Sequence, residues 1–268
     1  MFLLTDLNMS CLNFSKITKA LTAIAPFLCL AGIVVSQSQE YKKSAQKLNY
    51  ANYVSQENIQ AKSIELQQTS PKLGFNNLVA DWSYLNFVQY FGDAKARETI
   101  GYRLVPEYFE TITKIDPRFT QAHLRLSLAN SMYAGNAEQT VTLMEDILAA
   151  VEPESEAAAL LWTSKGLDEL LFLGDKKAAI ASYKAAAQWA ELSNNIRQDN
   201  LTIKDLESAL ESTDAIDLKE AQVRAWSGVL IHIRDRQKAK EIKDKISTLK
   251  AEILVLERAS NRSGEVNN

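Results

Sequence analysis

The side chains that could act in acid–base or metal chemistry are few and widely separated in this sequence. His123 lies in a stretch with helical periodicity and has no carboxylate at metal-ligand spacing. His232, the other histidine, borders a basic run that would repel a cation. We therefore expect both histidines to be structural and predict no metal site.

Acidic residues cluster at two places, but neither cluster has the arrangement of a general acid and base. Asp168 and Glu169 are adjacent, so in a helix their side chains point to different sides. The other cluster flanks Pro153 and consists of Glu152, Glu154 and Glu156. We interpret both clusters as solvated charge. The sequence also has no P-loop, G-x-G-x-x-G, G-x-S-x-G or H-E-x-x-H motif, and we predict a protein that is not an enzyme and uses no cofactor.

Composition predicts an all-α fold. A chain of 268 residues with 46% hydrophobic content can bury a sizeable core, and nine Gly and five Pro are few for a protein with many turns. Cys11 and Cys29 lie in or before an apolar N-terminal run, so the remaining chain can form no disulfide or thiolate zinc site. Four tryptophans at helical spacings are expected to pack in the core: Trp82, Trp162, Trp189 and Trp226.

Charge is distributed unevenly along the chain. The net charge of −3 is too small to indicate nucleic-acid binding. Residues 37–221 carry 18 basic against 26 acidic side chains, whereas residues 222–268 carry 10 basic against 6 acidic. We expect an acidic body with a basic C-terminal region, and no nucleic-acid partner.

An apolar segment near the N-terminus predicts membrane association. Residues 20–35 contain no charge, and the preceding Lys19 can extend its ammonium group toward lipid headgroups. A helix of this length spans about 24 Å, short of the roughly 30 Å hydrocarbon core, although flanking residues can absorb the mismatch. We predict a tail over residues 1–16 and a single-pass transmembrane or signal-anchor segment over residues 17–36.

A cleaved signal peptide is the alternative interpretation of this segment. Lys16 and Lys19 form a positive start, and Val34 and Ser36 supply small residues for cleavage before Gln37. The apolar run is long for a signal peptide and has no Ala-x-Ala site, so we favour an uncleaved anchor. The order of a basic start and an apolar run favours a body outside the cytoplasm, secreted or periplasmic if cleavage follows Ser36.

A polar spacer is predicted over residues 37–71, because this stretch is rich in Gln, Ser and Asn and its apolar face is too thin to define a core.

Helical hairpins are predicted over residues 72–192. The first is marked by apolar residues at steps of three and four, namely Leu78, Trp82, Leu85 and Val88. Helices are expected to end at three glycines, each followed by a capping Asp or Asn: Gly92, Gly135 and Gly174.

The last hairpin gives the clearest sign of a repeat. Ala179, Tyr183 and Ala186 fall at the offsets of the second helix of a tetratricopeptide repeat, where small residues let two helices approach closely. Trp162 and Gly166 keep the spacing expected in the first helix but lie one residue early. The offset implies one extra residue before the turn that joins the two helices.

The chain resembles the tetratricopeptide-repeat superfamily, and more narrowly the bacterial membrane-anchored repeat proteins with an N-terminal span. The resemblance covers roughly residues 73–189 and includes the block LGFNNLVADWSYLNFVQYFGD and a Phe-x-x-Ile-x-x-x-Asp-Pro-Arg-Phe segment over residues 109–119. It implies an α-solenoid of stacked hairpins whose concave groove holds a peptide or helix of a partner protein. It transfers no function to individual residues.

Repeat geometry nominates six residues for this groove: Ser83, Phe87, Tyr90, Arg125, Met132 and Thr163. The set combines aromatic surface with one cation suited to a carboxylate. The same spacing is also compatible with several of these residues being buried.

The C-terminal region is predicted to form a helical cap over residues 193–260 and a disordered tail over residues 261–268. Five apolar residues alternate by four and three over two heptads, fewer than a coiled coil needs: Ile242, Ile246, Leu249, Ile253 and Leu256. Acidic residues interleave with the basic cluster over residues 234–245, which favours a solvated face over an anion-binding patch.

Together these features favour a membrane-associated scaffold that mediates protein–protein interaction, with the assembly of a membrane complex as one role. The alternative is a structural protein that self-associates weakly through its C-terminal helix.

Overall fold

The structure is a computed structural model that describes residues 30–38, 49–155, 157–192, 208 and 210–266, with side chains described up to residue 261. Every regular element in these residues is helical, which confirms the all-α prediction. The chain divides into two compact units, Met1–Asn49 and Tyr50–Asn268.

In the first unit, residues 30–38 form a helix whose side chains are all exposed. None of the helices in the described part of the chain is both long and apolar enough to cross a membrane. Residues 1–29 lie outside the described residues, and they include the predicted tail and most of the predicted anchor. The anchor therefore stays a prediction.

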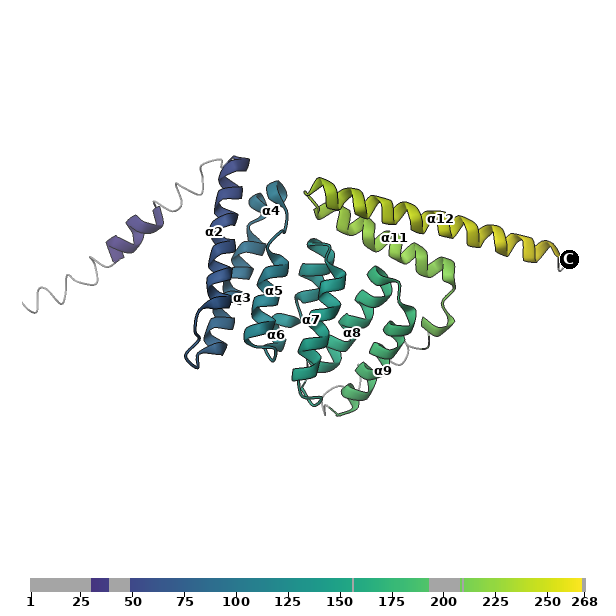
Figure 1. Cartoon of the computed structure of the whole chain (residues 1–268), viewed down its shortest axis with the longest axis horizontal. Coiled ribbons are helices and arrows are strands. Elements are labelled where there is room, and N and C mark those ends of the chain that lie inside the picture. The colour runs from purple at the N-terminus through teal and green to yellow at the C-terminus, as the bar shows by residue number, and fades with distance from the viewer. Residues whose placement is uncertain (1–29, 39–48, 156, 193–207, 209, 267–268) are drawn as a thin grey trace, which may run out of the picture. The chain divides into compact units, whose positions relative to one another are not determined.

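The second unit is a succession of helices, and short turns join those from α3 to α9 (Figure 1). Its α-helices are α2 (Tyr50–Thr69), α3 (Asn76–Gly92), α4 (Ala94–Ile100), α5 (Val105–Ile115), α6 (Thr120–His123), α7 (Ala137–Ala150), α8 (Ala158–Asp168), α9 (Lys176–Leu192), α11 (Ala215–His232) and α12 (Arg236–Val266). Two π-helical segments, η1 (Ser127–Tyr133) and η2 (Glu169–Leu173), extend α6 and α8.

Helix α2 shows that the predicted polar spacer is wrong for residues 50–69. Tyr53, Glu57 and Ile64 are buried on one side of this helix, which packs against α3, α4 and α5. The sequence pattern missed this side because one of its buried residues is a carboxylate. Its arginine partner, Arg97, lies 40 residues further along the chain.

The main core of the second unit joins α2, α3, α5, α7 and α8 through apolar side chains. Its centre is aromatic: the Phe87 and Phe109 rings meet edge to face with centroids 4.7 Å apart. Ile147 from α7 and Leu161 from α8 are fully buried in the same cluster. Successive hairpins thus share one core instead of burying their apolar faces separately.

The α8–α9 hairpin is close-packed at a glycine. A Cβ atom on Gly166 would lie 3.1 Å from a ring carbon of Tyr183 and 3.3 Å from the carbonyl oxygen of Ala179. Ala179 and Tyr183 are both buried. The absence of a side chain on Gly166 therefore lets the two helices approach more closely than any other residue would allow.

Both π-helical segments are followed, within two residues, by a glycine that takes the left-handed conformation. Gly135 has φ 68° and Gly174 has φ 72°, and each begins the turn into the next helix of its hairpin. In the second turn the Asp175 amide donates to the Glu169 carbonyl at 2.9 Å. A π-helical turn accommodates one extra residue in a helix, and η2 lies where the sequence offset requires one. Gly92 also ends a helix as predicted, but its φ is not positive.

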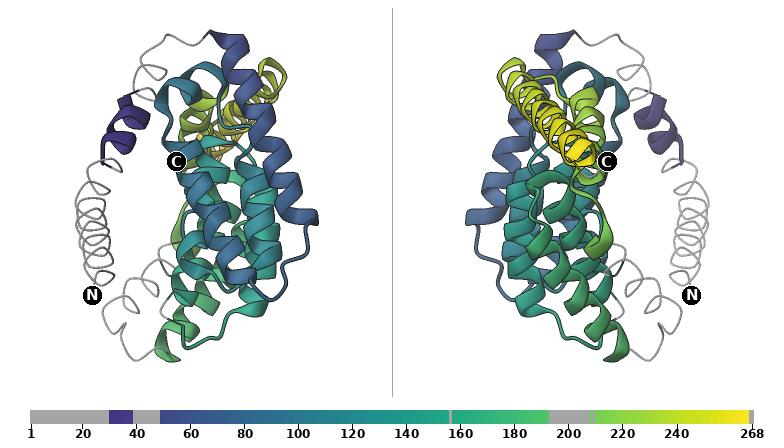
Figure 2. Two further views of the ribbon diagram at one scale, coloured as in Figure 1. Left: turned by 90° about the vertical axis from the view of Figure 1, so that its left-hand side faces the viewer. Right: turned by 90° about the vertical axis from the view of Figure 1, so that its right-hand side faces the viewer.

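Helices α11 and α12 form an antiparallel pair that crosses the upright helices of the hairpins (Figures 1 and 2). Helix α11 packs against both η1 and η2. A Cβ atom on Gly135 would lie 3.1 Å from Val229, and one on Gly174 would lie 3.1 Å from Gln222. The two turn glycines are thus required by the approach of α11 as well as by their backbone conformation.

The C-terminal end differs from the predicted tail. Helix α12 continues to Val266, so the expectation of disorder over residues 261–268 is wrong for residues 261–266. Ile242 and Ile246 are buried against α11 within the same chain. The Lys219–Glu252 ion pair, 2.6 Å long, joins the beginning of α11 to α12.

Candidate functional site

Three of the six predicted groove residues lie in the core, and their assignment to a groove is wrong. Ser83, Phe87 and Tyr90 are all less than 5% exposed on the inner side of α3. Ser83 donates a hydrogen bond to Gln67 of α2. Helix α2 covers this side of α3, although residues 50–69 were predicted to belong to a spacer.

The other three predicted groove residues do not gather at one site. Arg125 is exposed between α6 and η1. Met132 is half-buried and packs against the cluster formed by α11 and α12. Thr163 is half-buried and donates to the carbonyl oxygen of Ala159 within its own helix, at 2.9 Å. The described residues therefore contain no single groove lined by the predicted set.

The apolar residues of α3 that were predicted to pack in the core lie on its outer side and are exposed. Trp82 is 58% exposed, so the prediction that it packs in the core is wrong, whereas Trp226 is buried and Trp162 and Trp189 pack against the main core. The exposed apolar residues of α3 and of the turn before it form what we term the α3 face: Leu73, Phe75, Leu78, Trp82, Leu85 and Val88. The face extends over about three helical turns.

A cleft lies between the α4–α5 turn and the corner that joins α11 to α12. Its volume is about 870 Å³. Segments about 130 residues apart in sequence meet there. Its polar and aromatic lining includes Glu57, Asn58, Tyr102, Arg103, Tyr133, Asn136, His232, Arg234, Asp235, Arg236 and Lys238.

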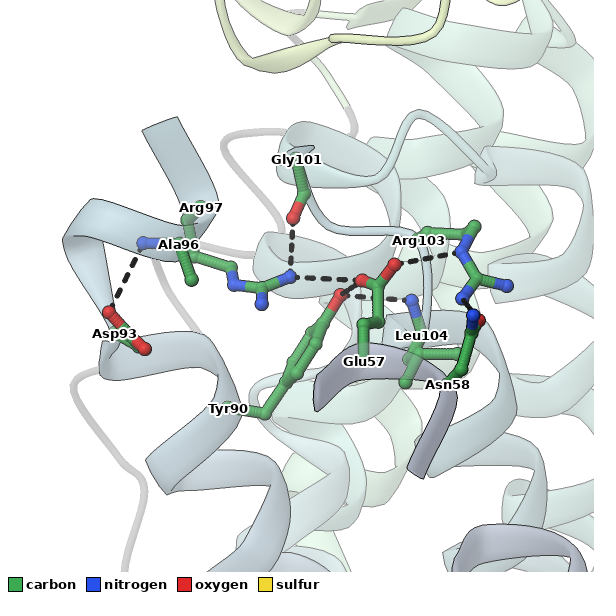
Figure 3. A network of polar contacts seen from close by, with 9 residues as sticks. All are labelled: Glu57, Asn58, Tyr90, Asp93, Ala96, Arg97, Gly101, Arg103 and Leu104. Carbon is green, nitrogen blue, oxygen red and sulfur yellow. Dashed lines mark hydrogen bonds and ion pairs between the residues drawn. The ribbon is translucent and has the colours of Figure 1, made fainter. Parts of the chain in front are cut away.

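One wall of the cleft is held by a buried carboxylate (Figure 3). The Tyr90 hydroxyl donates to Glu57 Oε1 at 2.7 Å, and Arg97 Nη1 lies 3.3 Å from the same oxygen. Arg103 Nε donates to Glu57 Oε2 at 2.9 Å. Two arginines thus compensate one carboxylate that is 3% exposed, which makes its burial tolerable.

The same network fixes the α4–α5 turn. The backbone amide of Leu104 donates to the Tyr90 hydroxyl at 3.1 Å, and Arg97 donates to the carbonyl oxygen of Gly101. Burial raises the pKa of Tyr90 above its usual value, so its hydroxyl stays protonated as a donor to Glu57. The turn and the outer arginine Arg103 are therefore held before any ligand arrives.

Aromatic rings form the floor of the cleft. The Tyr133 and His232 rings stack with centroids 4.1 Å apart, and Tyr102 meets Tyr133 edge to face at 5.0 Å. Burial and the neighbouring Arg234 guanidinium lower the pKa of His232, so the imidazole is neutral at pH 7. His232 contributes a ring surface to the cleft without adding positive charge.

Basic side chains form the corner of the cleft, and Arg234 and Arg236 are exposed there, which agrees with the predicted solvated face. Arg234, Arg236 and Lys238 all line it. Arg234 packs over Gly101, where a Cβ atom would lie 3.3 Å from the arginine side chain. Lys245, further along α12, instead lies over the Trp226 ring, with its ammonium 4.2 Å from the ring centroid. Only the first part of the basic cluster faces the cleft.

The acidic pair Asp168–Glu169 is buried, so its interpretation as solvated charge is wrong. Glu169 pairs with Lys165 one helical turn earlier and accepts a hydrogen bond from Ser182 at 2.6 Å. Asp168 Oδ1 accepts from Ser127 at 2.9 Å, and burial raises the pKa of Asp168 to about 7. Helical periodicity places the two residues on different sides, but α7, α9 and η1 cover both sides.

Both carboxylates that line the cleft already have partners within the chain. They are Glu57, which is engaged by two arginines, and Asp235, which accepts from the Lys238 amide at 2.7 Å. His123 lies elsewhere in the core, 3.2 Å from Thr113, and burial lowers its pKa to about 4. Within the described residues, no group of three or more His, Cys, Asp or Glu side chains could hold a metal ion.

The fold and the cleft define an all-helical protein built from antiparallel hairpins, with a C-terminal helix pair that closes one side of a basic, aromatic cleft. Comparison of the chain with protein-family models, with curated proteins and with solved structures finds no match.

Proposed function

We propose that this chain is a membrane-associated scaffold of tetratricopeptide-like hairpins that binds a helix of a partner protein on the α3 face. The observation that carries this proposal is the exposure of the α3 face. Each of its six large apolar side chains is at least 47% exposed. Exposed apolar side chains occur singly on most proteins, whereas a contiguous group of this kind marks an interaction surface.

The spacing of the α3 face favours a helix as the bound element. Leu78, Trp82 and Leu85 follow the i, i+4, i+7 pattern by which one helix packs along another. Helix α3 contains one charged residue, Asp81, so a partner helix with an apolar face meets little competing charge. A central tryptophan is typical of the residues that dominate the energy of such contacts.

Two features support the tetratricopeptide-like part of the proposal. The close contact of Gly166 with Ala179 and Tyr183 joins residues at the spacings that the resemblance requires. The π-helical turn η2 accounts for the extra residue between them. Helices α11 and α12 take the place of the predicted cap, although they cross two hairpins instead of extending the last one.

The membrane part of the proposal rests on the sequence. The uncharged run over residues 20–35 serves as a single-pass anchor, and the body lies outside the cytoplasm. Fractionation of cells that produce the full chain, followed by protease treatment of intact cells or spheroplasts, tests both statements. Recovery of a shortened chain in the soluble fraction would instead show cleavage after Ser36.

Crosslinking in native membranes tests the α3 face. The full chain is crosslinked and recovered, the main partner is identified by mass spectrometry, and its binding is measured again with purified proteins. Trp82→Asp combined with Leu85→Asp is expected to weaken that binding by about tenfold or more, as for other central apolar contacts. Leu128→Asp combined with Leu160→Asp is the matched control, because these leucines are also exposed but lie on η1 and α8.

Equal binding by the two double variants would contradict the assignment of the α3 face. Two other occupants give different results. A second copy of the chain would appear by light scattering as a dimer that the α3 double variant abolishes. Binding to lipid would appear as flotation of the chain with neutral vesicles, reduced by the same variant in the absence of any partner.

Self-association through the end of α12 is the second candidate function. Leu254 and Val255 are 53% and 65% exposed, and they follow the Lys219–Glu252 ion pair that joins α11 to α12. Light scattering of the full chain tests this alternative. A dimer that is lost in Leu254→Lys combined with Val255→Lys, and kept in the α3 double variant, would favour self-association over partner binding on α3.

A further inference from the structure

We infer that the cleft between the α4–α5 turn and the α11–α12 corner binds a multiply charged oxyanion, a phosphate or polycarboxylate group, through Arg234, Arg236 and Lys238. This site is separate from the α3 face and does not depend on the function proposed for it.

The cleft carries an excess of positive charge. Arg103, Arg234, Arg236 and Lys238 line it together with only two carboxylates, those of Glu57 and Asp235. Glu57 is engaged by Arg103 and by a second arginine behind the wall. Among the described residues, none of the three corner cations has a carboxylate within ion-pairing distance.

Two of these cations are held in place by neutral hydrogen-bond acceptors. Arg234 Nε donates to the carbonyl oxygen of Glu98 at 2.8 Å, and its Nη1 donates to that of Ile231 at 2.7 Å. Lys238 Nζ donates to the side-chain oxygen of Asn136. These acceptors are neutral, so they orient the side chains without cancelling their charge. Cations ordered in advance lose less conformational entropy when an anion binds.

Aromatic rings and the start of helix α12 also contribute to the corner. The rings of Tyr102, Tyr133 and His232 form a floor beside the cations. Helix α12 begins at Arg236, so its positive dipole end adds to the potential there, although Asp235 caps the Lys238 amide and partly offsets it. A cleft of about 870 Å³ falls within the usual range for small-molecule sites, about 300–1,000 Å³.

The chemistry of the ligand follows from these groups. Guanidinium and ammonium groups recognise phosphate and carboxylate oxygens with charge-assisted hydrogen bonds. Three cations on one corner favour a ligand with more than one negative charge over a simple monoanion. The oxyanion can belong to a free small molecule or to an acidic segment of a protein, and the two sources are distinguished by the probes below.

Titration calorimetry of the full chain at low salt tests the inference with three probes, namely inorganic pyrophosphate, citrate and a hexaglutamate peptide. We expect one site per chain. We also expect Arg236→Ala combined with Lys238→Ala to weaken binding by about tenfold or more, because two charge-assisted contacts are lost. Binding of pyrophosphate or citrate indicates a free small molecule, and binding of hexaglutamate alone indicates a protein segment.

The matched control is Lys240→Ala combined with Lys243→Ala. These lysines are exposed on the same helix, and their replacement changes the net charge by the same amount, but neither lines the cleft. Arg236→Glu alone gives a second test if the first double variant loses its helical circular dichroism. The inference is overturned if no probe binds at about 1 mM with low salt, or if both double variants weaken binding equally, since nonspecific charge attraction would then explain it.

Discussion

Replacing Asp168 by Asn is expected to stabilise the protein above neutral pH and to have little effect in mild acid. Asp168 is fully buried, and Oδ1 accepts one hydrogen bond from Ser127. Oδ2 has no hydrogen-bond partner among the described residues. Burial disfavours the charged form and raises the pKa of the carboxyl group from 3.8 to about 7, and the nearby hydroxyls of Ser127 and Ser131 only partly offset this.

The sign of the pH dependence follows from this raised pKa. Between about pH 4 and pH 7 the folded chain holds a proton on Asp168 that the unfolded chain has released. The free energy of unfolding therefore falls as the pH rises through this window, and the full cost of the buried charge is present above it. A difference of about 3 pH units corresponds to roughly 4 kcal/mol at most.

Thermal unfolding of the full chain, followed by circular dichroism at pH 5.5 and pH 8, gives the measurement. About half of the titration window lies above pH 5.5. The stability of Asp168→Asn relative to the native chain should therefore rise by about 2 kcal/mol between pH 5.5 and pH 8. For a chain of this size that is about 4–8 °C in Tm. Asp146→Asn, at an exposed position on α7, is the control and should show no such gain. A difference between the Asp168 variant and the native chain that stays constant with pH would refute the reasoning.

Three further perturbations test other parts of the fold by thermal or chemical unfolding. Gly166→Ala should destabilise the chain by about 1–3 kcal/mol through overpacking against Tyr183, whereas Gly228→Ala in the open middle of α11 should stabilise it by about 0.5–1 kcal/mol. If the two variants change stability alike, the close packing is wrong. Tyr90→Phe should lower the free energy of unfolding by about 1–3 kcal/mol, because the buried Leu104 amide and Glu57 each lose a hydrogen-bond partner. An unchanged unfolding midpoint would show that the network contributes little to stability. Ending the chain after residue 252 should change Tm by less than about 2 °C, since the side chains removed are mostly exposed, and a larger loss would show that the end of α12 supports the core.

The sequence predicted the helical elements and their turns where local signals were strong. Gly135 and Gly174 both end helices with a left-handed conformation, and Asp175 caps the next helix by accepting from the Ala178 amide at 2.9 Å. The offset of one residue before Gly174 also coincides with a local feature, the π-helical turn. These properties depend on neighbours within a few residues, so the local sequence is enough to predict them.

The sequence could not predict which side of α3 is buried, because both sides carry large apolar residues. Phe87 and Tyr90 lie on one side and Trp82 and Leu85 on the other. The choice is made by α2, which contributes Gln67 and Glu57 as polar partners for the inner side. Such pairings join residues 16 and 33 positions apart. Helical periodicity describes only the residues along one helix, so it cannot predict these pairings.

The candidate cleft was missed for the same physical reason. Its cations were visible in the sequence, but their interleaving with Asp235 and Glu241 suggested local ion pairs along one helix. In the structure Asp235 caps the start of α12 and Glu241 accepts a hydrogen bond from Gln237. Neither forms an ion pair with a corner cation, although both add negative charge near Lys238. Only the meeting of the corner with the α4–α5 turn makes these charges converge.

Helix α3 connects the two proposed binding surfaces, because it carries the α3 face and also supports one wall of the cleft. The α3 face points outward, while Tyr90 on the opposite side of α3 holds Glu57, which in turn orients Arg103 at the cleft. The Tyr90–Glu57 contact is buried and two arginines compensate the charge of Glu57, while Arg103 itself is about half exposed. We therefore expect α3 to behave as a rigid support instead of a moving part. Coupling between the two surfaces would require a second arrangement of the network. A partner on α3 and an oxyanion in the cleft should therefore bind independently, each with the same affinity in the presence or absence of the other.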